Sequence, residues 1–101
     1  MAVIVSFDLP GAGLEQVYEV EAKARRRSEE GDGAPYDGCL FFAVTRAAEG
    51  VATVSAWRAE HDFRRALEEA LRPDIEAVGL TVGRVTVSEA VSLSIRGAGP
   101  R

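Results

Sequence analysis

The sequence predicts a single α+β domain whose elements follow in the order β-α-β-β-α-β. Three observations predict this order. β-branched and aromatic residues fill four short segments, apolar residues at helical spacing fill two longer ones, and glycine- or proline-containing turns separate them. A length of 101 residues fits one compact domain. We therefore expect a domain over residues 1–95 and a loose tail over residues 96–101.

The first half of the chain predicts a strand, a helix and a hairpin. The segment AVIVSF predicts a strand over residues 2–8, which the turn LPGAG ends. A helix follows from Leu14 to about Arg27, and its expected inner stripe is Leu14, Val17, Tyr18 and Ala24. After the loop SEEGDGAPYDG, the segments GCLFFAVTR and VATVSAW predict two strands that AAEG joins as a hairpin.

The second half predicts a helix and a final strand. Apolar residues follow one helical face from His61 to Val78, and Gly79 closes the helix. Pro73 interrupts this pattern without changing its phase, so we expect one kinked helix. A fourth strand is expected within GRVTVSEAVSLSI, with a break near residues 88–90. Its residues at period-two spacing are Val85, Val87, Val91, Leu93 and Ile95.

This order is that of the ferredoxin-like fold, in which both helices cover one face of a four-stranded antiparallel sheet. The hairpin strands carry apolar residues on both sides. One predicted side has Cys39, Phe41 and Ala43 on the first hairpin strand, and the other has Leu40, Phe42 and Val44. The second hairpin strand has Val51 and Trp57 opposite Ala52, Val54 and Ala56. Because two helices cover only one face, we expect a second copy to cover the other, as a two-fold homodimer with facing sheets.

Composition narrows the partners and the compartment. A formal charge of −4 gives no basic field to attract nucleic acid. One cysteine and one histidine cannot form a disulfide or the usual zinc cage, so we expect no metal and a reducing environment. No apolar run is long enough to span a bilayer, and the N-terminus lacks the pattern of an export signal. We therefore expect a cytoplasmic protein.

The segment DGCLFFAV, a short turn, and then VATVSAWRAEHDFRRALEEALRPDIEAVG resemble the dimeric α/β barrel superfamily, which includes the antibiotic-biosynthesis monooxygenases. The resemblance covers most of the chain. In its small stand-alone members a tryptophan ends the third strand, an aromatic residue lies early in the second helix, and a proline lies later in that helix. Trp57, Phe63 and Pro73 match these positions. The resemblance implies a homodimer with a pocket between sheet and helices in each subunit.

The resemblance also implies which residues would meet a substrate. Monooxygenases of this kind hold an aromatic substrate with a strand tryptophan, an asparagine, and a helix histidine or arginine, and they need neither metal nor flavin. Only Trp57 matches, since the chain contains no asparagine. Thr53 lies one pleat earlier on the same strand, and Phe42 stands where related proteins often have histidine. No cofactor is expected.

Several candidate site residues have alternative interpretations. Trp57 either stacks on a ligand or fills the junction between the third strand and the second helix. Glu89 either points into an apolar face, where burial would favour a general base, or a bulge turns it to solvent. Tyr36, beside Pro35, either covers the pocket or packs on its rim. His61 begins the second helix and is interpreted as a surface residue at a helix start, not as a catalytic partner of Trp57.

Two functions remain open at this point. The first is binding of a small hydrophobic or aromatic molecule, with or without cofactor-independent monooxygenase-like turnover. Its ligand-binding candidates are Trp57, Thr53, Phe42, Tyr36 and Glu89, and no catalytic residue is assigned. The second is a non-catalytic dimerisation module whose pocket is filled by its own aromatic side chains. A surviving cavity of about 300 Å³ or more would favour the first.

Overall fold

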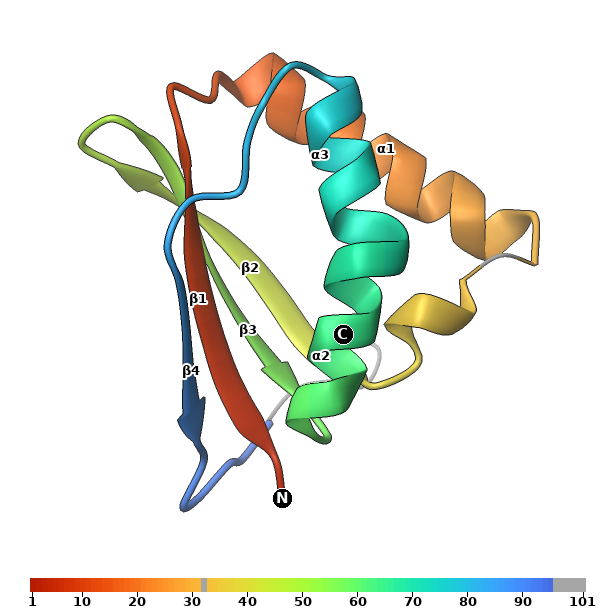
Figure 1. Ribbon diagram of the computed structural model, residues 1–101, viewed down its shortest axis with the longest axis vertical. Coiled ribbons are helices and arrows are strands. Elements are labelled where there is room, and N and C mark those ends of the chain that lie inside the picture. Colours follow the sequence, from red (N-terminus) through yellow and green to blue (C-terminus); the bar gives the residue numbers. More distant parts are fainter. Residues whose placement is uncertain (32, 96–101) are drawn as a thin grey trace.

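A computed structural model describes residues 1–31 and 33–95 as an antiparallel four-stranded sheet with helices on one face (Figure 1). The strand order is β2-β3-β1-β4, which confirms the predicted ferredoxin-like α+β fold. The elements are β1 (Val3–Pro10), α1 (Leu14–Glu29), the 3₁₀ turn η1 (Ala34–Tyr36), β2 (Cys39–Ala47), β3 (Gly50–Trp57), α2 (Glu60–Ala66), the π-helical segment η2 (Leu67–Leu71), α3 (Arg72–Ala77) and β4 (Val85–Glu89). The predicted tail, residues 96–101, lies outside the described residues.

The central strands β1 and β3 direct alternate side chains into the core. They pair antiparallel from Val3 opposite Trp57 to Pro10 opposite Gly50. The side chains of β1 that face the helices are all buried, as are the matching side chains of β3. They are Val3, Val5, Phe7 and Leu9 on β1, and Val51, Thr53, Ser55 and Trp57 on β3. Alternation with period two thus places the tryptophan inside, as the pattern of β3 predicts.

The sides of strand β2 differ from the prediction at its first residue. The pairing of β2 with β3 shifts between Cys39 and Phe41, because Cys39 lies opposite Trp57 while Phe41 lies opposite the next residue, Ala56. Leu40 is therefore the extra residue of a β-bulge. The bulge puts Cys39 on the helix side of the sheet with Phe42, and the prediction that Cys39 shares a side with Phe41 is wrong.

Helix α1 begins with a side-chain cap. The Gln16 side-chain oxygen accepts the Gly13 N–H at 3.0 Å, and its amide nitrogen donates to the carbonyl of Val78 at 3.1 Å, so one residue ties the start of α1 to the end of α3. The expected inner stripe is only partly correct. Val17 is buried, whereas Leu14 and Tyr18 are exposed, so the inner face of the helix is rotated away from them.

The second helical region is continuous from α2 to α3, as predicted (Figure 1). Its irregularity is the π-helical segment η2, which ends two residues before Pro73. Proline cannot donate the hydrogen bond that an α-helix needs, and a wider turn just before it accommodates this loss. Helix α3 ends at Ala77, and Gly79 follows its C-cap with a φ of +86°, which favours glycine. The Leu80 N–H donates to the carbonyl of Ile75 at 3.2 Å.

The last strand is shorter than the apolar pattern predicts. β4 pairs with β1 from Val85 to Glu89, and the chain then leaves the sheet, which matches the expected break near residues 88–90. Beyond it Val91 is fully exposed, so the second half of the predicted strand is not formed.

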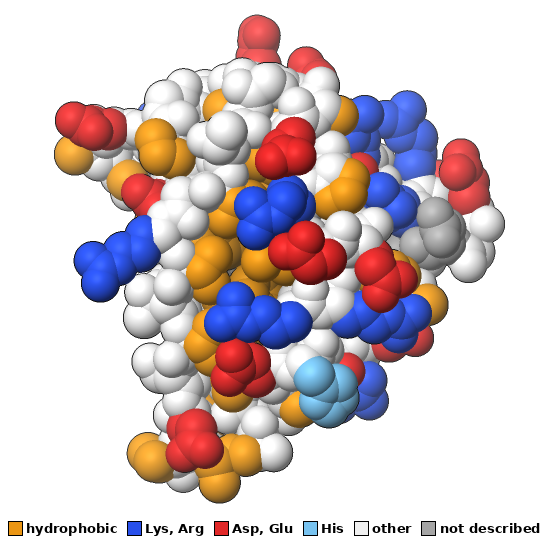
Figure 2. Space-filling view, in the orientation of Figure 1, with side chains coloured by type: hydrophobic (Ala, Val, Ile, Leu, Met, Phe, Trp, Pro, Cys, Tyr) orange, Lys and Arg blue, Asp and Glu red, His pale blue; other side chains and the backbone are white. Residues whose placement is uncertain are grey.

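The helical layer is charged on its outer surface. Figure 2 shows hydrophobic side chains in a band between the sheet and the helices, with side chains of both charges over the helical layer. Three i,i+4 pairs there join Glu60 to Arg64, Arg65 to Glu69, and Glu68 to Arg72. In the described part of the chain, no helix has the length and apolar character needed to cross a membrane.

Candidate functional site

A cavity of about 370 Å³ lies between α1 and the helix-facing side of the sheet. Its walls come from β1, β2, β3, α1, η1 and the second helical region. The lining residues are Phe7, Leu9, Val17, Val20, Glu21, Ala24, Arg25, Ser28, Tyr36, Cys39, Phe42, Val44, Thr53, Leu71 and Ile75. Most of this surface is apolar, and the volume is within the range of small-molecule sites. Phe42 is 40% exposed although it lines the cavity, so the cavity opens to solvent beside the edge strand β2.

Short side chains on α1 leave this space unfilled. The inner face of the helix presents Val17, Val20, Ala24 and Ser28 in successive turns toward the sheet. Ala24 and Ser28 have short side chains and line the same unfilled cavity as Phe42 and Val44. Such a space is unusual because protein interiors are close-packed. The sequence pattern identified Val17 and Ala24 as inner residues but gave no measure of the distance they have to span.

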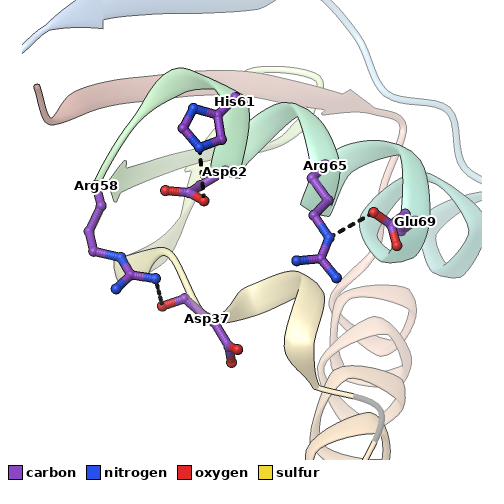
Figure 3. Close-up of polar contacts among 6 residues, drawn as sticks. All are labelled: Asp37, Arg58, His61, Asp62, Arg65 and Glu69. Atoms are coloured by element: carbon purple, nitrogen blue, oxygen red, sulfur yellow. Dashed lines mark hydrogen bonds and ion pairs between the residues drawn. The ribbon is translucent and has the colours of Figure 1, made fainter.

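The segment before β2 closes one end of the cavity. Pro35 is buried, and the Tyr36 N–H donates to the carbonyl of Gly33 at 2.9 Å, so η1 is held from within. From outside, a guanidinium nitrogen of Arg58 donates to the carbonyl of Asp37 at 3.0 Å (Figure 3). These contacts hold Tyr36 in the cavity wall, so the loop residue predicted near the pocket is one of its lining residues.

The Tyr36 hydroxyl lies in an unusual environment. The oxygen is buried and has no hydrogen-bond partner among the described residues. Burial raises the pKa of Tyr36 to about 12, the negative charge of Asp74 adds to the rise, and the positive charge of Arg27 opposes it. The phenol therefore stays protonated at neutral pH and remains a hydrogen-bond donor.

Arg27 and Asp74 form the ion pair beside that hydroxyl. The Nε and Nη2 atoms of Arg27 each lie 2.9 Å from one carboxylate oxygen of Asp74, a two-point contact between α1 and α3. Asp74 is buried, and the side chain of Arg27 is mostly covered. The pair holds the C-terminal end of α1 against the second helical region at the Tyr36 end of the cavity.

Trp57 lies in the core and outside the cavity lining. Its side chain is completely buried, its indole N–H donates to the Ser55 hydroxyl at 2.9 Å, and its ring meets the edge of Phe63 at a centroid distance of 5.6 Å. These contacts join the end of β3 to the start of α2. This geometry favours the interpretation that Trp57 fills the junction between β3 and α2 over the interpretation that it stacks on a ligand.

Of the other three predicted site residues, two line the cavity and one does not. Thr53 and Phe42 line the cavity, and the Thr53 hydroxyl donates to the Phe7 carbonyl at 3.2 Å. Glu89 is exposed and does not line it. It pairs with Val3 on the edge strand β4 without a bulge, so neither of the two alternatives holds: its side chain is exposed although the strand is unbroken.

Neither His61 nor Cys39 forms a reactive group here. Figure 3 shows His61 beside Asp62 at the start of α2. The side chain of His61 is 85% exposed, whereas that of Trp57 is completely buried. Burial raises the pKa of the Cys39 thiol, which disfavours a thiolate. Within residues 1–31 and 33–95, no three histidine, cysteine, aspartate or glutamate side chains are grouped to hold a metal ion.

Sequence reasoning missed most of the cavity wall. Leu9 and Phe7 on β1 and the polar residues Glu21 and Arg25 on α1 were not proposed as site residues. The signal that could have found them is the spacing of residues 17, 20, 21, 24, 25 and 28, which follows one helical face with short side chains at its centre.

Comparison with known proteins gives likenesses of fold. No protein-family model matches the sequence, and no curated protein matches it. SnoaB of Streptomyces nogalater, described as a cofactor-independent oxygenase, superposes with a TM-score of 0.58 at 18% identity, over 91% of this chain and 93% of that chain.

Two further solved structures have the same architecture. A candidate antibiotic biosynthesis monooxygenase of Deinococcus radiodurans has a TM-score of 0.54 at 19% identity, over 96% of this chain and 100% of that chain. Rv0793 of Mycobacterium tuberculosis has a TM-score of 0.54 at 20% identity, over 93% and 97%. These values show a likeness of fold: this chain has the ferredoxin-like fold that these solved structures share.

Proposed function

We propose that this protein binds a small, mostly apolar molecule in the cavity between α1 and the sheet. The observation that carries the proposal is the cavity itself, which has a volume of about 370 Å³ and mainly apolar walls. A module with a pocket filled by its own aromatic residues would leave no such space. Phe42 and Phe7 are in edge contact with centroids 6.3 Å apart, yet they form one wall of the cavity and do not fill it.

Turnover is the second candidate function, and the likeness to SnoaB, described as a cofactor-independent oxygenase, favours it. The tryptophan that the resemblance places on the substrate is a packing residue here, and the hydroxyl-bearing residues that line the cavity are Ser28, Tyr36 and Thr53. Oxygen uptake in the presence of 1-naphthol, with metal and flavin absent, tests this activity. Oxygen uptake no faster than in the same solution without the protein would mean that the protein binds without turnover.

The proposal includes a homodimer formed through the open face of the sheet. The centre of this face carries the apolar side chains Ile4, Phe41, Ala43 and Val54, which lie together by strand register. Polar residues such as Ser6 and Thr86 lie toward its β4 side. A second copy related by a two-fold axis presents the same apolar strip, which is the simplest cover for it.

Native mass spectrometry of protein from its own cells tests ligand and dimer together. We expect a dimer that carries a defined small-molecule mass. The variant Ala24→Phe fills the cavity from α1 and should remain a dimer while losing that mass, whereas Ala22→Phe, on the same helix but outside the lining, should keep it. A dimer without retained mass in all three proteins would argue for the dimerisation module.

The dimer itself is tested by a charge on the open face. Val54→Lys places an ammonium group in the apolar strip and should give a monomer by light scattering at the same protein concentration. Glu69→Lys on the outer helical surface should leave the dimer unchanged. If Val54→Lys stays dimeric, the subunits meet through another surface.

A further inference from the structure

Three polar residues of α1 lie at the rim of the cavity. Glu21, Arg25 and Ser28 line the cavity, and all three are exposed. A residue that both lines a cavity and meets solvent lies at the boundary between the two. Their spacing of one helical turn each puts them on the same side of α1. Phe42 on β2 is also exposed and lines the cavity, so an aromatic ring and three polar side chains border the opening.

The inner wall of the cavity carries no charged side chain. Among the described residues, the charged ones that line the cavity are Glu21 and Arg25, both at the rim. The buried lining residues are Phe7, Leu9, Val17, Thr53, Leu71 and Ile75. An unpaired charge is costly to bury, so a charged ligand should leave its charged group at the rim and put its apolar part inside.

The two charges at the rim are not paired with each other. Glu21 and Arg25 have the spacing and order of Glu60 and Arg64, which form an ion pair with an N–O distance of 3.2 Å. Within residues 1–31 and 33–95, by contrast, neither the Glu21 nor the Arg25 side chain has a hydrogen-bond or ion-pair partner. The Arg25 guanidinium is therefore an unused donor group, and its planar fork matches the two oxygens of a carboxylate.

We propose that the ligand is an amphipathic acid, whose apolar part fills the inner cavity and whose carboxylate binds Arg25 at the rim. This inference rests on the proposed binding function and deepens it, because it defines the ligand by chemical class. Glu21 opposes an anion at the rim. The guanidinium offers several N–H donors, however, and Ser28, one turn further along α1, adds a hydroxyl that no described residue uses. Oxygen atoms that accept hydrogen bonds thus find more partners at this rim than donor groups do.

A pair of probes that differ in charge tests the inference. 2-Naphthoate and 2-naphthamide have the same shape, and only the first is ionised at neutral pH. Wild-type protein should bind 2-naphthoate more tightly than 2-naphthamide by about two- to fivefold, the range of one exposed ion pair. Arg25→Gln should remove this preference through a loss for 2-naphthoate alone. Arg26→Gln makes the same change of charge one residue along, outside the lining of this cavity, and should keep the preference.

The opposite charge at the rim gives a prediction of opposite sign. Glu21→Gln removes a negative charge from the rim and should increase the preference for 2-naphthoate. Raising the ionic strength from about 0.01 M to about 0.15 M should reduce the preference in wild type, because salt screens exposed charges, and should not weaken 2-naphthamide binding. Chemical-shift titration of the protein measures all of these dissociation constants.

The outcomes separate the binding function from the proposed head group. Ala24→Phe fills the cavity and should weaken both probes. If neither probe binds wild-type protein, or if both bind Ala24→Phe as well as wild type, the proposed binding function fails. If the two probes bind equally, or if Arg25→Gln keeps the preference, the cavity binds apolar molecules and the carboxylate contact is overturned. Tighter binding of 2-naphthylmethylammonium than of 2-naphthoate would also overturn it, because the rim would then select a cation through Glu21.

Discussion

We predict that the hydrogen bond between Trp57 and Ser55 contributes to the stability of the fold, in addition to the packing of the tryptophan ring. Both side chains are completely buried, and the indole N–H lies 2.9 Å from the Ser55 hydroxyl oxygen. Ser55→Ala leaves a buried N–H without an acceptor and should lower the free energy of unfolding by about 1–3 kcal/mol. Trp57→Phe removes the donor and part of the ring that meets Phe63, and should cost about 2–4 kcal/mol.

The double variant separates the hydrogen bond from the packing. Because either single change already breaks the bond, the two costs should exceed the cost of the double variant by about 0.5–1.5 kcal/mol. Urea unfolding followed by far-UV circular dichroism measures the four free energies, at one protein concentration because a dimer is proposed. Tyr18→Phe combined with Trp57→Phe serves as the additive control, since Tyr18 is exposed on α1.

Additivity of Ser55→Ala and Trp57→Phe to within about 0.3 kcal/mol would refute the hydrogen bond. Loss of the retained small-molecule mass from folded Trp57→Phe in native mass spectrometry would refute the placement of Trp57 outside the site. The two measurements are independent, because the first reports stability and the second reports binding.

Three further predictions follow from single interactions. Asp74→Asn should destabilise the fold by about 1.5–3 kcal/mol in urea unfolding because it weakens a buried charged contact with Arg27, while Arg65→Gln, at an exposed pair, should cost less than about 1 kcal/mol. The pKa of Tyr36 is about 12 in the fold, above the ordinary value of 10.0. The stability that the protonated Tyr36 side chain contributes is therefore complete below pH 10 and is lost as the pH rises through 12. The difference between the ultraviolet titrations of wild type and Tyr36→Phe should show a midpoint near 12. Gly79→Ala should cost about 1–2 kcal/mol in the same unfolding assay, because φ is +86° there.

The order of elements could be predicted because each has a local signal. Alternating β-branched residues define β1 and β3, and Gly79 marks the end of the helical region. The phase of the apolar stripe across Pro73 was enough to predict one continuous helical region, although it could not show that η2 would absorb the proline as a π-helical turn. That detail depends on which backbone hydrogen bonds remain, and the side-chain pattern does not report them.

The candidate site was harder to predict because it depends on register and distance. A single bulge at Leu40 moves Cys39 to the helix side of the sheet, and no local residue type announces it. Leu14 and Tyr18 share a helical stripe with Val17, yet the orientation of α1 on the sheet leaves both exposed. The cavity is what remains when a helix with short inner side chains lies over the sheet, so its volume is a property of the packed layers.

The placement of Trp57 shows why a resemblance in fold transfers packing more readily than chemistry. Trp57 ends β3, which leads directly into α2, and its ring packs against Phe63 across that junction. The Ser55 hydroxyl also accepts a hydrogen bond from the indole N–H of Trp57, so the tryptophan side chain has no unused donor. The hydroxyl-bearing side chains of the cavity wall are Ser28 on α1, Tyr36 on the segment that precedes β2, and Thr53 on β3. Loops and surface positions vary more freely than core positions among proteins of one fold, so the polar groups of a cavity wall can differ between proteins whose core packing is alike.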